Sequence, residues 1–430
     1  AGSSVATCTL NLVLSTVGVG ALTVPWTTAT LGWLQMSALL LLVSLVSIYN
    51  LYLLDSTCRA LPRGSHWSSY GGLVAAALGR SGAYALEAFM LLYSFGLLVS
   101  YLGVVGTELA TLVSKLAGTA PAAAAGWLGR PDALMALAVL LAVLPLSLLP
   151  DTSLRFAGAL GTACMVFTTA VIMGSAPWRP WPTLLEPCAA APEVRPEPVA
   201  LDPVAWVPSV SGLLTSVPML TFCMNAATAF VAVRSQLRAG SRSEAAQPPR
   251  KSVVTMIWVG QLLALLNYAL CSAAGYLTFC GAVPDNVLNA YPASHLTSLA
   301  ARAALTVQLS LACAGVYVPL ARASLWHLLR GLEADAAPGA FTRGLMTCVL
   351  LLAVCAVAAA LDGMLALPLG LTSAVCTTAI MFVFPGLCYS RLQASAGLCK
   401  RGAAVLFAAS GLAVGAASAV TILAGAASGG

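Results

Sequence analysis

The chain has 430 residues, of which 60% are hydrophobic and 8% are charged, and its mean hydropathy is +0.92. Soluble domains carry roughly 25% charged residues, so this composition excludes a soluble enzyme and indicates a polytopic membrane protein. The net charge of +6 comes from Lys and Arg at the ends of apolar segments, without a continuous basic face, which argues against a nucleic-acid partner. Because the chain opens at Ala1 without Met, a preceding cytoplasmic tail is one expectation.

The first apolar segment, Leu10–Trp33, carries Gly18, Gly20 and Pro25 in its middle. In lipid every backbone N–H and C=O must be bonded, so irregular backbone is tolerated only where it is buried in protein or lines a polar cavity. An interruption in this span therefore predicts a binding site.

Ten further apolar segments follow the first, each predicted to contain one membrane span of about 20 residues. They are Met36–Leu54, Ala83–Leu116, Ala133–Leu149, Leu154–Met173, Val210–Val233, Val253–Phe279, Leu299–Leu320, Met346–Leu361, Leu369–Tyr389 and Ala403–Leu423. A Pro-rich stretch at 177–203 reads as an exposed loop between the fifth and sixth spans. We therefore expect an all-α protein with about eleven transmembrane helices.

Basic residues predict the orientation of these spans. With the N-terminus in the cytoplasm, alternate loops place fifteen of the twenty Lys and Arg residues on the cytoplasmic side. The other side then keeps five, Lys115, Arg130, Arg179, Arg195 and Arg302. The positive-inside rule favours this orientation, with the C-terminus external or luminal.

The sixth segment repeats the feature seen in the first. Residues 209–230 contain Pro218 in the middle and Asn225 two turns later. Many transporters repeat five helices in inverted orientation and interrupt the first helix of each repeat. We expect this LeuT-like plan here, with Pro25 and Pro218 as hinges, whereas a plain proline kink is the alternative at Pro218.

Five short motifs, in order, support a family resemblance. They are NLVLSTVGVGALTVPWTTATLGW, SFGLLVSYLGVVGTEL, SVPMLTFCMNAATAFVAVRSQL, GYLTFCGAVPDNVLNAY and VPLARASLWHLL. The chain resembles the amino acid/auxin permease family, the amino acid transporter transmembrane domain, and is most similar to the sodium-coupled neutral amino acid transporters of solute carrier family 38. The resemblance implies one transporter domain over 1–430, with repeats at about 5–176 and 204–393 and an extra helix at about 402–425.

The resemblance also implies a substrate site. Backbone N–H groups freed at Thr16, Gly18, Val19 and Gly20 would face an amino acid carboxylate at the positive end of a half-helix. Tyr101 would close the site from the side, and Asn225 would contact the substrate. The alternatives are close helix packing for the glycines, aromatic packing for Tyr101 and a neighbouring helix as the partner of Asn225.

A cation site is implied less completely. Ser310 falls on the family's eighth-span hydroxyl position and is a candidate Na⁺ ligand, although membrane serines commonly bond their own helix. Leu14 and Ala312 stand where sodium-coupled relatives often carry an Asn and a hydroxyl, so Na⁺ and H⁺ both remain open as coupling ions. Glu108 is expected to be an interfacial carboxylate solvated by lipid headgroups, with a cation or proton acceptor in the vestibule as the alternative.

The thirteen cysteines include no CxxC pair, so buried free thiols are expected for most of them. Cys188 and Cys280 fall on the same external side and could pair if that side is oxidising. None of the three histidines has metal-ligand spacing, and we expect neither a metal site nor a cofactor.

These features predict a secondary active transporter of small or neutral amino acids that works by alternating access. No phosphate loop is present, so uphill transport must draw on a Na⁺ or H⁺ gradient. The alternatives are a non-transporting amino acid sensor on the same fold and, from another class, an intramembrane enzyme. We expect membrane lipid as a partner, function as a monomer, and a plasma, vacuolar or lysosomal membrane as the location.

Overall fold

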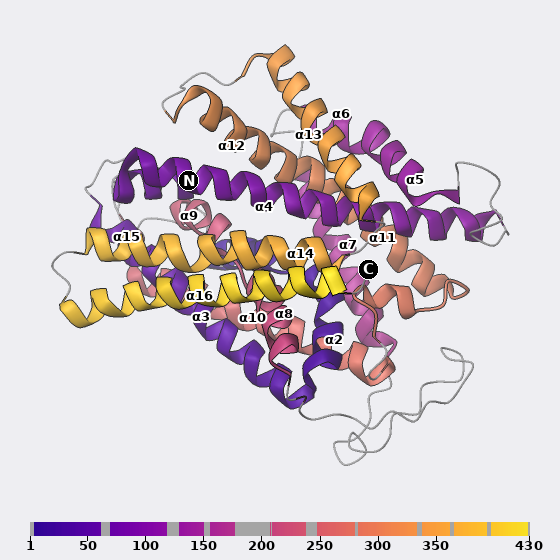
Figure 1. Ribbon diagram of the computed structural model, residues 1–430, viewed down its shortest axis with the longest axis horizontal. Helices are drawn as coiled ribbons and strands as arrows, with labels where there is room; N and C mark the ends of the chain where they lie inside the picture. Colours follow the sequence, from indigo (N-terminus) through magenta and orange to yellow (C-terminus); the bar gives the residue numbers. More distant parts are fainter. Residues whose placement is uncertain are drawn as a thin grey trace.

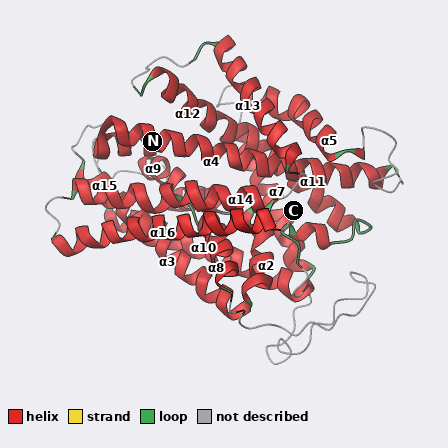
Figure 2. Cartoon of the chain, viewed as in Figure 1, coloured by secondary structure: helices red, strands yellow, loops and turns green. Residues whose placement is uncertain are grey.

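The computed structural model describes residues 4–61, 69–117, 129–149, 155–176, 207, 209–237, 247–279, 283–332, 338–361, 365–393 and 397–428. Every regular element in these ranges is a helix, as Figure 2 shows. Nine helices in them are long and apolar enough to cross a membrane, and a bent helix pair near the N-terminus makes a tenth. A shorter apolar helix, Ala159–Gly174, covers the segment expected as the fifth span.

The helices divide into two runs separated by the Pro-rich stretch. The first run comprises α1 (Val5–Thr16), α2 (Gly20–Leu31), α3 (Trp33–Ala60), α4 (Tyr70–Leu116), α5 (Pro131–Ala138), η2 (Val139–Val143), α6 (Leu144–Leu148) and α7 (Arg155–Gly174). The second run comprises α8 (Val210–Cys223), α9 (Ala227–Gln236), α10 (Arg250–Phe279), η6 (Val287–Ala290), α11 (Leu296–Ala312), η7 (Cys313–Tyr317), α12 (Val318–Arg330), α13 (Ala340–Ala360), α14 (Ala366–Thr372), η8 (Ser373–Thr377), η9 (Ala379–Val383), α15 (Phe384–Leu392) and α16 (Leu398–Ser428).

The bundle has two ends, which lie left and right in Figure 1, where α4, α14 to α15 and α16 run side by side across the picture. At one end, here called the N-terminal face, α1 begins and α3, α9, α12 and α15 end. At the other, the opposite face, α2 and α4 end and η6, α11 and α14 begin. Each face collects the ends of helices that are far apart in the sequence.

The first span is broken, as its glycines predict. Helices α1 and α2 meet at 59° across a break at Val17–Val19. Pro25 lies inside α2 and not at the break. A Cβ on Gly275 of α10 would lie 2.5 Å from Pro25 Cβ, so this glycine lets α10 pack directly on the proline ring.

The sixth span is also interrupted, but not at the predicted residue. Helix α8 continues through Pro218 to Cys223, and α9 begins at Ala227, so the break lies at Met224–Ala226 and contains Asn225. The Pro218 carbonyl accepts hydrogen bonds from Thr221 Oγ1 at 2.8 Å and from Ser373 Oγ of η8. Helix α8 thus continues past the proline with the loss of one helical N–H donor, as membrane helices tolerate. Expecting the break at Pro218 was therefore wrong by about two turns.

The last helix packs on the second run through small residues. A Cβ on Gly415 of α16 would lie 2.5 Å from the Ala374 carbonyl, and one on Gly386 of α15 would lie 2.5 Å from the Ala404 carbonyl. Such glycines let membrane helices approach each other closely. Helix α16 is therefore a packed part of the bundle, longer than the expected 402–425.

Candidate functional site

The break in the first span is bridged by a tyrosine from α10. Tyr268 Oη donates to the Thr16 carbonyl at 2.8 Å and accepts from the Gly18 N–H at 3.3 Å. Tyr268 is fully buried, and its ring lies beside Gly20 and Cys223, the last residue of α8. One side chain therefore holds the first break by hydrogen bonds and contacts the end of the helix that precedes the second break.

The bridge changes which backbone groups are available at this break. The Gly18 N–H, expected to be unpaired, is taken by Tyr268. Among the described residues, the N–H groups of Val19 and Gly20 have no hydrogen-bond partner, since the following bonds begin at Ala21 and Leu22. These two N–H groups lie at the N-terminus of α2, where a helix favours an anion.

The two glycines of the break have different surroundings. A Cβ built on Gly20 would collide with Cys223 Sγ, so Gly20 permits close packing of α2 on α8. A Cβ on Gly18 would meet only Tyr101 Oη, at 3.9 Å. Between Gly18 and Tyr101 there is therefore space for one added carbon in ordinary van der Waals contact.

Aromatic side chains from α4 and η7 form one wall beside this space. The rings of Tyr101 and Tyr317 pack edge to face with centroids 5.3 Å apart, and Tyr93 lies 6.5 Å from Tyr317 in the same arrangement. Tyr317 ends η7, a π-helical segment within the eighth span. Single π-helical turns occur frequently at functional sites, because the wider turn re-aims side chains.

The second break supplies a free donor. Asn225 Oδ1 accepts from the Ala227 N–H at 3.1 Å and so caps α9, while Asn225 Nδ2 is buried without a hydrogen-bond partner. The hydroxyl of Tyr93 lies next to this amide. Ser47 Oγ of α3 donates to the Met224 carbonyl at 2.7 Å and fixes the backbone on the other side. The unpartnered Nδ2 donor is available to a ligand.

The remaining predicted residues are placed as follows. Thr16 Oγ1 donates to the Leu12 carbonyl of its own helix at 2.8 Å, so Thr16 offers the site only its backbone carbonyl. Ser310 is buried in α11, three residues before η7. Cys188 and Cys280 lie outside the described residues.

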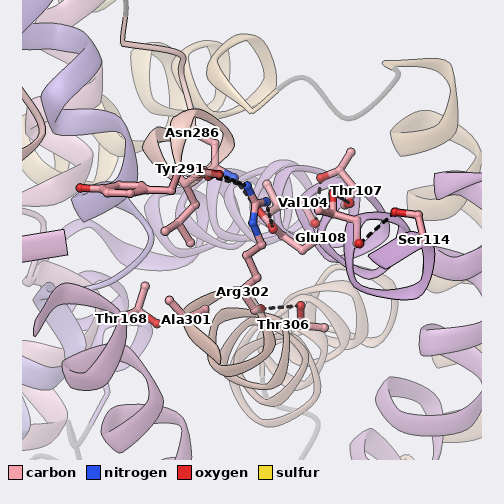
Figure 3. A network of polar contacts seen from close by, with 12 residues as sticks. Val104, Thr107, Glu108, Ser114, Thr168, Asn286, Tyr291, Ala301, Arg302 and Thr306 are labelled. Carbon is pink, nitrogen blue, oxygen red and sulfur yellow. Dashed lines mark hydrogen bonds and ion pairs between the residues drawn. The ribbon is translucent and has the colours of Figure 1, made fainter. Parts of the chain in front are cut away.

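Glu108 is not an interfacial carboxylate, contrary to the expectation from the sequence. Its side chain is fully buried, and Oε2 accepts from Arg302 Nη1 of α11 at 2.5 Å, while Oε1 accepts from Asn286 Nδ2 at 2.8 Å. Arg302 Nη2 also donates to the carbonyls of Leu288 and Tyr291, at 2.5 and 3.2 Å. Figure 3 shows these groups converging between α4 and α11. Burying a carboxylate alone is far costlier than burying it with a charged partner. Arg302, counted from the sequence as a charge of an external loop, is that partner and lies buried in α11.

This buried network fixes the segment 283–291 over the opposite face. Asp285 Oδ2 accepts from the N–H groups of Leu365 and Ala366, at 3.1 and 3.0 Å, and so caps α14. Val287 packs near Gly275, where α10 meets Pro25 of α2. Burial raises the pKa of Tyr291 to about 12, so its hydroxyl is neutral at physiological pH. The segment therefore ties α2, α4, α11 and α14 together beside the break.

A second buried ion pair lies near the N-terminal face. Asp55 Oδ1 of α3 accepts from Arg234 Nε of α9 at 2.6 Å, and Asp55 Oδ2 accepts from Arg59 Nε at 2.8 Å. Arg234 Nη2 donates to Gln247 Oε1 at 2.7 Å. Arg234, taken from the sequence as a loop charge, is 1% exposed and joins α9 to α3.

Sequence reasoning missed Tyr268, Arg302 and Asp55. The signal for the two charged residues was their position within or at the edge of an apolar segment, where an ionisable group needs a partner. Tyr268 gave no comparable signal, because a tyrosine in a membrane span is ordinary and its partner is a backbone 250 residues away. Only the fold brings these groups together.

Comparison with known proteins gives the family. The family described as "Transmembrane amino acid transporter protein" matches residues 1–425. Human solute carrier family 38 member 8 is 27% identical over 300 residues, which cover 69% of this chain and 63% of that protein. Rat sodium-coupled neutral amino acid transporter 7 is 24% identical over 295 residues, covering 68% of this chain and 58% of that protein. The matched part is thus less than two thirds of either relative.

A solved transporter has a similar fold. The crystal structure of the Eremococcus coleocola manganese transporter, in complex with an aromatic bis-isothiourea substituted compound, superposes with a TM-score of 0.54 over 98% of this chain and 87% of that one. The sequences are only 12% identical, so this likeness concerns the fold alone. The family match over almost the whole chain, on an all-helical fold with two interrupted spans, establishes that the chain belongs to the transmembrane amino acid transporter family.

Proposed function

We propose that the protein is a secondary active transporter of small or neutral amino acids, which it moves by alternating access. The observation that carries this proposal is the break at Val17–Val19, where the N–H groups of Val19 and Gly20 are unpartnered beside the space next to Gly18. The names of the relatives, which include sodium-coupled neutral amino acid transporters, agree with it.

The substrate carboxylate is proposed to bind the N–H groups of Val19 and Gly20 at the start of α2. Both the unpaired donors and the helix dipole favour an anion there. Asn225 Nδ2 supplies a further donor from the sixth span, so the substrate would join the two interrupted spans. Tyr101 and Tyr317 would border the substrate side chain.

Alternating access is proposed to use both breaks. Pro25 and Pro218 lie inside α2 and α8, within two turns of the breaks, and each removes one helical N–H donor. These prolines would let the half-helices bend as the protein changes conformation. The five-plus-five division, with repeats at about 5–176 and 204–393, is part of this proposal.

The coupling ion is proposed to be Na⁺ or H⁺. The relatives' names favour Na⁺, and Ser310 beside η7 is the proposed hydroxyl ligand. Leu14 and Ala312 supply no oxygen ligand from their side chains, so H⁺ stays as the second possibility. The N-terminal face is proposed to be cytoplasmic, and the protein to work as a monomer in a plasma, vacuolar or lysosomal membrane.

Transport and coupling can be tested together in proteoliposomes. Uptake of Gln, Ala, Pro and GABA should be measured under a Na⁺ gradient and, separately, under a pH gradient. We expect at least one amino acid to accumulate under one gradient and not under the other. If amino acids stabilise the protein against heat but none is taken up or exchanged, the protein is a sensor and the transporter proposal is wrong.

A further inference from the structure

A cavity of about 810 Å³ lies where α12 and the first turn of α13 meet α4 and α6. One part of its wall reaches Thr228 of α9 and Gly315 of η7. Another part, toward the N-terminal face, is formed by Arg322, Trp326 and Arg343. The function proposed above makes no use of this second part.

Two residues that line the cavity, Trp326 and Arg343, each carry a buried donor that has no partner. Trp326 Nε1 and Arg343 Nε are buried and make no hydrogen bond. Both atoms can only donate, and a buried donor without an acceptor is costly. No carboxylate is among the described residues that line the cavity, and His327, which does line it, has its Nδ1 3.0 Å from Glu87 Oε1. In the described residues these two donors therefore stay without an acceptor.

The cavity is also positively charged. The guanidinium of Arg322 is held at the wall by hydrogen bonds from Nη1 to the Ser147 carbonyl at 3.2 Å and to Thr347 Oγ1 at 3.1 Å. Arg343 faces the same cavity from the next helix. Guanidinium groups stay charged at any physiological pH and match the geometry of phosphate oxygens. The charge of these two lining arginines therefore favours an anion as the ligand.

The size and the rest of the lining indicate what kind of anion fits. Met90, Leu149, Val316 and Leu320 give the cavity an apolar wall. A volume of about 810 Å³ is within the range of sites for small organic ligands and far larger than a bare phosphate ion. Basic pockets between membrane helices near the headgroup region suit anionic lipids. We propose that this cavity binds a phosphate group, with an anionic phospholipid as its source.

The proposal can be tested with the whole chain purified in detergent. Phosphatidylglycerol, phosphatidylcholine, inorganic phosphate and glycerol phosphate would each be titrated, and binding followed by native mass spectrometry and by the thermal unfolding midpoint. We expect phosphatidylglycerol to bind and to raise the midpoint, and phosphatidylcholine to do so far less. If the soluble phosphates bind equally well and with the same dependence on Arg343, the site takes phosphate from solution, which still supports the shared chemistry.

Two substitutions and one control decide whether phosphatidylglycerol binds in this cavity. Arg343→Gln should weaken phosphatidylglycerol binding by about tenfold or more, since a charge-assisted bond is lost. Trp326→Phe keeps an aromatic side chain but loses the five-membered ring of the indole with its Nε1 donor, and should weaken binding severalfold even if Arg343→Gln fails to fold. Arg391→Gln is the control, because it removes an exposed arginine at the end of α15, on the same face and outside the cavity.

Three results would overturn the proposal. Equal binding by the wild type, Arg343→Gln and Trp326→Phe would show that the cavity is not the site. An equal loss in Arg391→Gln would show that only surface charge matters. If Arg343→Gln instead weakens amino acid binding and leaves the lipid-dependent shift intact, the arginine serves the substrate and not a phosphate.

Discussion

The hydroxyl of Tyr268, which is fully buried, holds the backbone at the first break by two hydrogen bonds. It supplies an acceptor to Gly18 and a donor to Thr16, two backbone groups that the interruption would otherwise leave buried and unpaired. Such groups cost about 1–3 kcal/mol each when unsatisfied. The residue therefore stabilises an irregular backbone that lipid would not tolerate.

Tyr268→Phe tests this role. We expect a loss of about 1–3 kcal/mol in the free energy of unfolding, because the ring packing is kept and the bridge is lost. We also expect a raised KM for the transported amino acid with a smaller change in kcat, since the N–H groups of Val19 and Gly20 are no longer held in place. The control Tyr389→Phe, near the end of α15, should change neither the free energy of unfolding nor the KM by much. An unchanged KM would show that Tyr268 is only a packing residue.

Gly18→Leu tests the space at the break. An added Cβ has room, since only Tyr101 Oη lies within 4 Å, but a leucine side chain would fill the space proposed for the substrate. We expect uptake to be abolished, with the free energy of unfolding within about 0.5 kcal/mol of the wild type. Gly344→Leu in α13, where nothing lies within 4 Å, is the matched control and should transport normally. Normal uptake by Gly18→Leu would remove this glycine from the substrate site.

At the scale of elements, the two buried ion pairs join helices that no loop connects directly. Glu108 and Arg302 tie α4 to α11 and to segment 283–291, and Asp55 and Arg234 tie α3 to α9. Buried pairs add little net stability when formed, but breaking one leaves a charge without compensation. These contacts therefore hold α4 to α11 and α3 to α9.

Glu108→Gln should lower the free energy of unfolding by about 3–5 kcal/mol, because Arg302 is left as an unpaired buried charge. The double variant Glu108→Gln with Arg302→Gln should recover part of that loss. Denaturant or thermal unfolding in detergent measures both. A change below about 0.5 kcal/mol in the single variant would mean that the carboxylate is solvated, as the sequence alone had suggested.

At the scale of the whole molecule, the positive-inside rule and the alternation of helices predict that the N-terminal face is cytoplasmic. Cys399, exposed at the start of α16, lies on that face, and Ser428 ends the same helix at the opposite face. In intact cells, and with the other cysteines replaced by Ser, a membrane-impermeant maleimide should label Ser428→Cys and not Cys399, if the protein lies in the plasma membrane. Permeabilised cells should label both, and the reverse pattern in intact cells would invert the orientation.

The sequence by itself determined the class of the protein. Apolar length predicted about eleven spans, and the described residues contain nine spanning helices, a bent pair that makes a tenth, and a shorter apolar helix. Gly18 in the middle of the first span predicted its break, because only a few residue types let backbone leave the helix in lipid. Asn225 was singled out as a polar group in an apolar segment, and it lies in the second break. Each of these is a local property, readable from neighbouring residues.

Only the tertiary structure decided what each break contains. The proline in the sixth span does not mark its interruption, since α8 continues through Pro218 and the break lies at Met224–Ala226. Glu108 is a buried ion pair and not a surface carboxylate, because Arg302 arrives from a helix 194 residues away. The Gly18 N–H is taken by Tyr268, and Gly20 makes room for Cys223. Partners that are distant along the chain set the energy of a buried polar group, and the sequence order does not contain their positions.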